Sequence, residues 1–242
     1  MQSDFFMIIL KIDMTSSVAS LFNKIAKHYD LLNHLLSLNI DKKWRRKSLR
    51  GHINADTQLV LDVACGTGDF SLQLMASGVK RVVGVDISEE MVKVGQQKVI
   101  KRGFQSGIAL QMGDSACLQF DSNTFDLVTV AFGVRNFEKR AESLAEMLRV
   151  LRPQGEVIIL EFSTPTKFPI KQLYRLYFKQ ILPFVGGLIS GHRDAYQYLP
   201  NTVYAFPQGE QFLAEMRMAG FTHLSYRKMS FGIVSVYYGK KL

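Results

Sequence analysis

Short apolar runs alternate with helix-forming segments through the middle of the chain. Five such runs predict strands, at 58–63, 81–86, 108–113, 125–132 and 156–162. Strands of a parallel sheet are buried on both faces, so they contain few polar positions. Helices are predicted between them at 69–78 and at 139–151, the second closed by residues 152–155. A third helix is predicted from Ser88 onward, with Ser88 as its capping residue. The alternation predicts a doubly wound α/β sheet.

The flanks of this region follow other patterns. Residues 15–50 have apolar positions at helical spacing and predict helices that precede the sheet. Residues 163–206 contain several prolines and a long apolar run, which predicts an apolar insertion. This insertion would cover a site for a lipophilic acceptor, and the alternative is simple lid packing over the core. A helix at 209–219 and a strand pair at 221–229 and 233–238 complete the chain. We expect a single domain over the whole sequence.

A glycine turn after the first predicted strand carries the most informative chemistry. The strand enters Gly66, Thr67 and Gly68, and the next strand ends in Asp86, followed by Ile87. Glycine lets a ligand approach the backbone closely because it has no Cβ. A carboxylate at the tip of the second strand can accept hydrogen bonds from two ribose hydroxyls. The pattern predicts a site for an adenosine-containing cofactor.

The same turn favours S-adenosylmethionine over a dinucleotide. A dinucleotide site has a third glycine and holds a pyrophosphate at the helix N-terminus. Here the third glycine is missing, and Asp69 would repel the pyrophosphate. S-Adenosylmethionine has no phosphate but carries an ammonium and a sulfonium, which suit Asp62 and Asp69. The prediction is a methyltransferase, and the alternative is an ordinary strand–turn–helix with a capping acid.

Two further pairs follow the third and fourth strands, at the edge where ligands of open α/β sheets bind. Asp114 and Ser115 are placed to reach the adenine, with a turn-forming pair as the alternative. Arg135 and Asn136 lie where the methyl acceptor is expected. Arginine stays charged near neutral pH, so Arg135 would stabilise a developing phenolate or orient a water. The alternative for Arg135 is a structural ion pair.

Much of the net charge of +9 comes from a basic run at 41–50 around Trp44. Such a run can face RNA, anionic lipid headgroups or plain solvent. A tryptophan among cations fits an interfacial site better than solvent. The segment 132–137 lacks the proline motif of amino-methylating nucleic-acid enzymes, and neither cysteine fits a cytosine-methylating nucleophile. We therefore expect no nucleic-acid partner.

Composition excludes several other classes. The two cysteines predict neither a disulfide framework nor a metal cluster. No apolar run reaches the length of a membrane span. Residues 1–13 lack the basic start and cleavage site of a secretory signal, and Met14 is an alternative start. These features predict a cytoplasmic protein.

Five segments resemble the quinone C-methyltransferases of ubiquinone and menaquinone biosynthesis, the UbiE/MenG family. They read FNKIAKHYDLLNHLLSLNIDKKWRR, LDVACGTGD, FGVRNF, LRPQGEVIILEFS and ILPFVGGLISGHRDAYQYLPNTVYAFP. The resemblance implies a seven-stranded Rossmann-like class I methyltransferase sheet with helices on both faces and an antiparallel last strand. It also implies that Thr67, Asp86 and the pair Asp114–Ser115 contact S-adenosylmethionine. Ala131 stands where the family often has a serine associated with the cofactor.

The resemblance further implies methyl transfer to a ring carbon of a prenylated quinol. We expect demethylmenaquinol, although the family also methylates ubiquinone precursors. Arg135 would then stabilise the quinol oxyanion with Asn136 as a second donor, and Tyr29 would close over the cofactor. The proton acceptor that this reaction needs has five candidates, namely His28, Asp30, Glu161, His192 and Asp194.

A prenyl tail would explain the basic run and the apolar insertion as a peripheral contact with an anionic membrane surface. Two other functions stay open at this point. One is an RNA or small-metabolite methyltransferase that uses the basic run. The other is a regulatory protein that binds the cofactor without catalysis. The sequence indicates no oligomeric state and no prenyl chain length.

Overall fold

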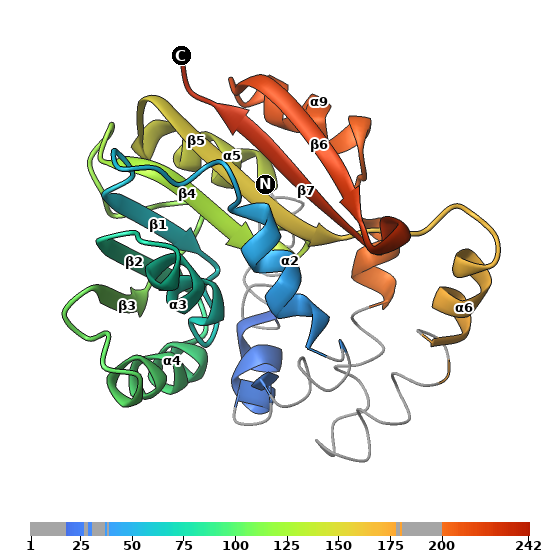
Figure 1. Ribbon diagram of the computed structural model, residues 1–242, viewed down its shortest axis with the longest axis horizontal. Helices are drawn as coiled ribbons and strands as arrows, with labels where there is room; N and C mark the ends of the chain where they lie inside the picture. The colour runs from blue at the N-terminus through green and yellow to red at the C-terminus, as the bar shows by residue number, and fades with distance from the viewer. Residues whose placement is uncertain (1–17, 27–28, 31–36, 38, 178–179, 181–199) are drawn as a thin grey trace, which may run out of the picture.

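The computed structural model describes residues 18–26, 29–30, 37, 39–177, 180 and 200–242. Within them, one seven-stranded sheet has the order β3-β2-β1-β4-β5-β7-β6 (Figure 1). The strands are β1 (Leu59–Val63), β2 (Arg81–Asp86), β3 (Ile108–Met112), β4 (Phe125–Ala131), β5 (Leu151–Phe162), β6 (Thr222–Met229) and β7 (Val234–Lys240). Strands β1 to β5 pair in parallel, and β7 is antiparallel to both β5 and β6. The predicted topology is confirmed.

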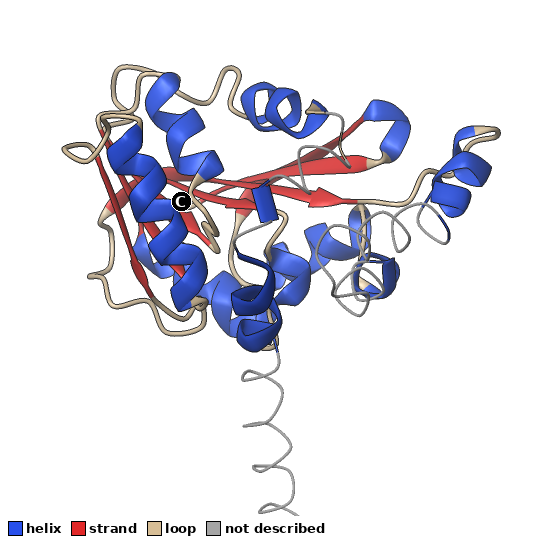
Figure 2. Cartoon of the chain, turned by 90° about the horizontal axis from the view of Figure 1, so that it is seen from below, coloured by secondary structure: helices blue, strands red, loops and turns tan. Residues whose placement is uncertain are grey.

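Helices cover both faces of this sheet, as the nearly edge-on view in Figure 2 shows. Buried side chains of α2, α3 and α4 pack on one face, and those of α5 and α9 pack on the other. Residues 18–26 are also helical. The remaining helices are α2 (Ile40–Ser48), α3 (Asp69–Ala76), α4 (Glu89–Lys101), α5 (Arg140–Val150), α6 (Ile170–Leu176) and α9 (Glu210–Met218).

The central strands are apolar on both faces because each face has its own core. Along β4, Leu127 packs into the core under α2, α3 and α4, whereas Val128 packs into the core under α5 and α9. Successive side chains of a strand point to opposite faces, so both positions must be apolar. Burying each such side chain is worth about 1.5–3 kcal/mol. This double burial produces the continuous apolar runs seen in the sequence.

The start of α4 is capped as the sequence predicts, and it also holds the N-terminal helix. Ser88 Oγ accepts a hydrogen bond from the backbone N–H of Met91 at 3.3 Å. The same hydroxyl donates to Oδ1 of Asn23 at 2.6 Å, and Asn23 lies in the helix at 18–26. The capping residue therefore joins the N-terminal helix to the end of β2, next to Asp86.

The fifth strand is longer than predicted. The sequence places a turn at 152–155 and starts the strand at Glu156, but β5 already begins at Leu151. The pairing with β4 jumps from Leu151 opposite Phe125 to Glu156 opposite Leu127, and Gln154 has a positive φ of 65°. The predicted turn is thus an irregularity inside a continuous strand, because Leu151, which precedes the turn, already pairs with Phe125 of β4.

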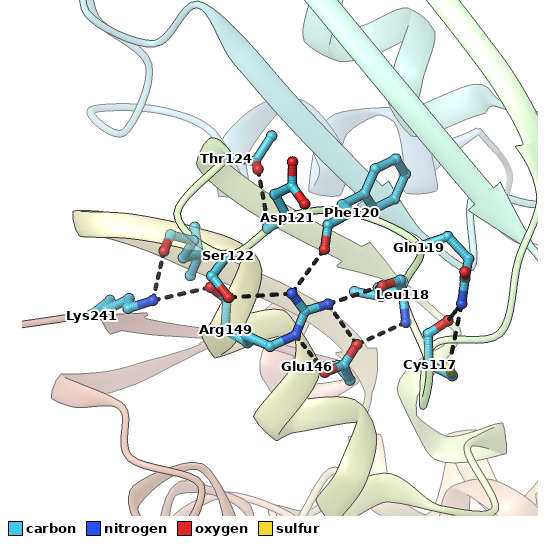
Figure 3. Close-up of polar contacts among 11 residues, drawn as sticks. Cys117, Leu118, Gln119, Phe120, Asp121, Ser122, Thr124, Glu146, Arg149 and Lys241 are labelled. Atoms are coloured by element: carbon cyan, nitrogen blue, oxygen red, sulfur yellow. Dashed lines mark hydrogen bonds and ion pairs between the residues drawn. The ribbon is translucent and has the colours of Figure 1, made fainter.

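The loop that precedes β4 is anchored by Arg149 in the last turn of α5 (Figure 3). Its guanidinium donates to the carbonyl oxygens of Phe120 at 2.8 Å and Leu118 at 2.9 Å, and pairs with Glu146 at 2.7 Å. The Nζ of Lys241 donates to the carbonyl oxygen of Arg149 at 3.1 Å. These bonds hold the loop at the amino-terminal ends of β4 and β5, opposite the carboxyl ends of the strands where ligands of open α/β sheets bind.

The predicted insertion at 163–206 is only partly described. Helix α6 and a helical segment at 200–205 belong to it, while 178–179 and 181–199 lie outside the described residues. Among the helices that the structure describes, none has the length and apolar character required to cross a bilayer.

Candidate cofactor and acceptor site

A cavity lies at the carboxyl ends of β1 and β4, beneath the N-terminal segment. Its floor is the glycine turn between β1 and α3, and its walls come from α2 and the helical turn at 29–30. The lining residues are Tyr29, Arg45, Asp62, Ala64, Cys65, Gly66, Thr67, Asp69, Phe70 and Ala131. The structure therefore brings the predicted residues Tyr29, Asp62, Gly66 and Thr67 to one place.

The turn holds the Asp86 carboxylate against the glycine backbone. Its two oxygens accept hydrogen bonds from the N–H groups of Gly66 at 2.8 Å and Ser88 at 2.9 Å. Burial raises the pKa of Asp86 above its usual 3.8, and backbone hydrogen bonds from Ser88, Gly66 and Ile87 oppose that rise. Gly66 has a φ of 54°, and a Cβ there would meet no atom within 4 Å. The acid thus stands beside a backbone segment that borders open space, which fits a ribose.

Asp62 is the buried acid of the cavity, with 1% of its surface exposed. Its carboxylate accepts hydrogen bonds from Ser71 at 2.7 Å and Thr129 at 2.9 Å. Burial raises the pKa of Asp62 to about 6, although those two hydrogen bonds and the charge of Arg45 lower it. No residue that the structure describes forms an ion pair with Asp62, and a carboxylate that is costly to ionise is suited to receiving the ammonium of a ligand.

Asp69 is predicted to meet a cation of the ligand, and that role stays a prediction. It lines the cavity, but Lys98 of α4 pairs with it at 2.8 Å. Lys98 also pairs with Asp30 at 2.5 Å and donates to Thr67 Oγ1 at 3.1 Å. The hydroxyl of Thr67 in turn donates to Asp30. The negative charge of Asp69 is therefore already offset, and Asp62 is better placed than Asp69 to meet a cationic ligand.

The other predicted cofactor contacts, Ile87 and the adenine pair Asp114–Ser115, lie at the adjacent strand ends. Ile87 follows β2 and is 36% exposed. Asp114 accepts a hydrogen bond from the N–H of Ala116 at 2.9 Å, which is the turn considered as its alternative role. The hydroxyl of Ser115 shares a hydrogen bond with that of Ser143 in α5 at 2.9 Å. The role of Ser115 toward adenine stays a prediction.

Arg135 is held in a buried ion pair. Its Nη1 lies 2.8 Å from Oε1 of Glu161, and the two side chains are 5% and 0% exposed. The same nitrogen donates to the carbonyl oxygen of Phe132, and the guanidinium lies 5.5 Å from the centre of the Phe162 ring. The structural ion pair considered from sequence is present. A role of Arg135 or Asn136 toward an acceptor stays a prediction.

The five candidate proton acceptors separate into two groups. His28, His192 and Asp194 lie outside the described residues. Asp30 is paired with Lys98, and Glu161 is paired with Arg135. Both described candidates thus border the site and carry a cationic partner.

The interfacial position predicted for Trp44 is wrong. The side chain is 5% exposed, packs beside Phe132 and Phe162, and donates from Nε1 to Ser230 Oγ at 2.7 Å. Arg45 is buried as well, together with Asp41 and Ser48 of the same helix. Four other cations on α2 are exposed, namely Lys42, Lys43, Arg46 and Lys47.

Sequence reasoning missed the parts that Arg45 and Lys98 play at the site. Arg45 was counted only as part of the basic run, and Lys98 was not singled out, because a cation in an amphipathic helix normally faces water. One signal was available for Arg45. The buried residues of α2 fall at 41, 44, 45 and 48, which is the spacing of one helix face, and that face is mostly polar.

Comparison with known proteins agrees with this geometry. Residues 10–241 match the model of the ubiE/COQ5 methyltransferase family. A demethylmenaquinone methyltransferase of Bacteroides fragilis is 43% identical over 228 residues, covering 94% of this chain and 93% of the relative. The ubiquinone/menaquinone biosynthesis C-methyltransferase UbiE of Geobacter sulfurreducens is 42% identical, covering 93% and 88%.

Solved structures support the fold. An S-adenosylmethionine-dependent methyltransferase of Thermotoga maritima, described as a possible histamine N-methyltransferase, superposes with a TM-score of 0.64 at 16% identity. The match covers 92% of this chain and 99% of that one. At this identity the likeness shows the class I methyltransferase fold alone.

Proposed function

The chain belongs to the ubiE/COQ5 methyltransferase family, and from that premise we propose that it methylates a ring carbon of demethylmenaquinol to give menaquinol. The observation that carries this function is the 43% identity to a demethylmenaquinone methyltransferase along 94% of the chain. The enzyme is a C-methyltransferase whose methyl donor is S-adenosylmethionine. A further relative named demethylmenaquinone methyltransferase, from Thermus thermophilus, is 41% identical and is matched over its full length.

The residues around the glycine turn fit this donor. Asp86 would accept the ribose hydroxyls, and the Gly66 backbone borders open space beside it. Asp62 would accept the ammonium, while Tyr29 lines the opposite wall. When bound, the donor supplies an electrophilic methyl on a sulfonium. The protein's task is then to hold the acceptor carbon in line with that methyl.

The acceptor residues are proposed at the end of β4. Removing a proton from a quinol hydroxyl raises electron density at the adjacent ring carbon, which favours methyl transfer. Arg135 would stabilise the oxyanion so formed, with Asn136 as a second donor. The ion pair with Glu161 holds the guanidinium in one buried position at this strand end. The proton would pass to Asp30, Glu161 or one of the three candidates outside the described residues, directly or through water.

We further propose a peripheral contact with an anionic membrane surface. A prenylated quinol resides in lipid, so the enzyme would meet this substrate at the membrane surface. Exposed cations on α2 and exposed apolar side chains on α6 support this contact. The apolar side chains are Phe168 just before the helix, Leu173 and Leu176, which are 81%, 58% and 47% exposed.

Mass spectrometry of quinones tests the activity. Cells that lack this gene should accumulate a menaquinone precursor one methyl lighter, and a plasmid copy should restore the mature quinone. Purified protein with S-adenosylmethionine and a reduced demethylmenaquinone analogue should form the methylated product. An unchanged quinone pool together with no turnover on the reduced analogue would contradict the function.

A further inference from the structure

Arg45 is a buried cation at the wall of the cofactor cavity. It comes from α2, and its side chain is 9% exposed. Its Nη1 pairs with Asp41 at 2.5 Å and lies 3.8 Å from Asp69. The guanidinium carbon lies 5.6 Å from the centre of the Phe132 ring. The side chain lines the same cavity as Asp62 and Thr67, so it can contact what binds there.

Among the residues that the structure describes, one buried donor of this guanidinium is left unsatisfied. The Nε of Arg45 is buried and has no hydrogen-bond partner within the described residues. A guanidinium carries five N–H donors, and leaving one buried and unsatisfied costs free energy. An anionic or polar group of a ligand would remove that cost. The burial and the missing partner together indicate that Arg45 serves a bound molecule rather than solvent.

The chemistry of the cofactor supplies such a group. The methionine part of S-adenosylmethionine carries an ammonium and a carboxylate at the same carbon. Asp62 suits the ammonium, and a carboxylate beside it requires a cation. Lys98 is near the turn, but it is occupied by Asp30 and Asp69. We propose that Arg45 binds the carboxylate of the methionine part, while Asp41 holds the guanidinium in place.

This inference deepens the proposed function because it rests on the cofactor assigned to the site. It predicts a specific dependence of affinity on the carboxylate. S-Adenosylhomocysteine has that group, whereas its decarboxylated form, S-adenosyl-3-thiopropylamine, keeps the ammonium and lacks only the carboxylate. The native protein should therefore bind S-adenosylhomocysteine about 10- to 100-fold more tightly than the decarboxylated form, as expected for a charge-assisted bond.

The test is a cycle of two ligands and two proteins. Trp44 is the chain's single tryptophan and neighbours Arg45, so its fluorescence reports binding without turnover. Arg45→Met should weaken S-adenosylhomocysteine about 10- to 100-fold and change the affinity for the decarboxylated ligand little. Arg46→Met is the matched control, because Arg46 is the next residue on α2 and is exposed. It should leave both affinities unchanged.

Each outcome decides the proposal. Equal affinity of the native protein for both ligands overturns it, as does an equal loss for both ligands in Arg45→Met. If circular dichroism shows that Arg45→Met does not fold, Arg45→Lys keeps the charge and should retain part of the preference for the carboxylate ligand. Failure of the native protein to bind S-adenosylhomocysteine at all would instead contradict the proposed function.

Discussion

Individual charged residues in this site are buried, and each is stabilised in a different way. Arg135 and Glu161 neutralise one another, whereas hydrogen bonds from Ser71 and Thr129 support Asp62. Removing a charge from water costs several kcal/mol unless a partner compensates it. Stability and function are therefore coupled at these positions, and experiments on them need variants that separate the two.

The pair Arg135–Glu161 can be tested with such variants. Arg135→Met leaves Glu161 buried without its partner and should cost about 3–5 kcal/mol in the free energy of unfolding. Arg135→Met combined with Glu161→Gln removes both charges and should recover most of that stability. If Arg135 stabilises the quinol oxyanion, turnover should stay at least about 100-fold low in both variants. Urea unfolding and steady-state kinetics measure the two effects, and near-native turnover in the double variant would contradict the role.

The pH dependence of cofactor binding should report Asp62. Its pKa is raised to about 6 by burial, so it is ionised at pH 7 and mostly protonated at pH 5. An ammonium prefers the carboxylate form, and affinity for S-adenosylhomocysteine should fall about tenfold as pH drops from 7 to 5. Calorimetry measures this fall. 5′-Methylthioadenosine lacks the amino-acid part and is the control ligand, and an equal fall for it would assign the effect elsewhere, for example to Asp86.

At the scale of elements, the sequence predicts what depends on local pattern and misses what depends on distant partners. The strand ending in Asp86 and the Ser88 cap are local, and both were correct. Helix α2 was misjudged because its inward face combines Asp41, Trp44, Arg45 and Ser48. Hydrophobic periodicity cannot detect a polar inner face, and Trp44 meets its partner Ser230 only in the folded chain.

Lys98 connects three elements around the cavity, and its loss should loosen the N-terminal segment. Its bonds join α4 to Asp30 and to Asp69 at the start of α3. These groups are partly exposed, so the cost in overall stability should be at most about 1 kcal/mol. Lys98→Met should instead weaken S-adenosylhomocysteine binding by several-fold. Hydrogen exchange near Tyr29 should also rise.

A matched control for that variant is Lys101→Met, at the exposed end of the same helix. It should leave the ligand affinity and the exchange rates of the N-terminal segment as they are. Unchanged binding in Lys98→Met, or equal effects in both variants, would show that the ion pairs do not hold the segment.

On the scale of the whole molecule, the amino-terminal and carboxyl-terminal ends of the parallel strands carry different surfaces. The Arg149 network holds the loop at the amino-terminal ends of β4 and β5 (Figure 3). Helix α2 packs by Trp44 on Phe132 and Phe162, at the carboxyl ends of β4 and β5, and its other side exposes cations. The exposed apolar side chains Phe168, Leu173 and Leu176 lie in or just before α6, which comes after the carboxyl end of β5 in the chain. The net charge of +9 alone could not predict this placement.

Membrane contact should therefore depend on where the cations lie and not on their number. Flotation with vesicles containing anionic lipid should recover the native protein at low salt and less of it at high salt, because exposed charges are screened. Changing the α2 cations Lys42, Lys43, Arg46 and Lys47 to Gln should abolish recovery. The matched control changes Lys80, Arg81, Lys101 and Arg102, which are equally exposed at the opposite edge of the sheet. Equal losses in the two variants would show that the contact is a general effect of net charge. Failure of the native protein to float at either salt concentration would exclude the contact.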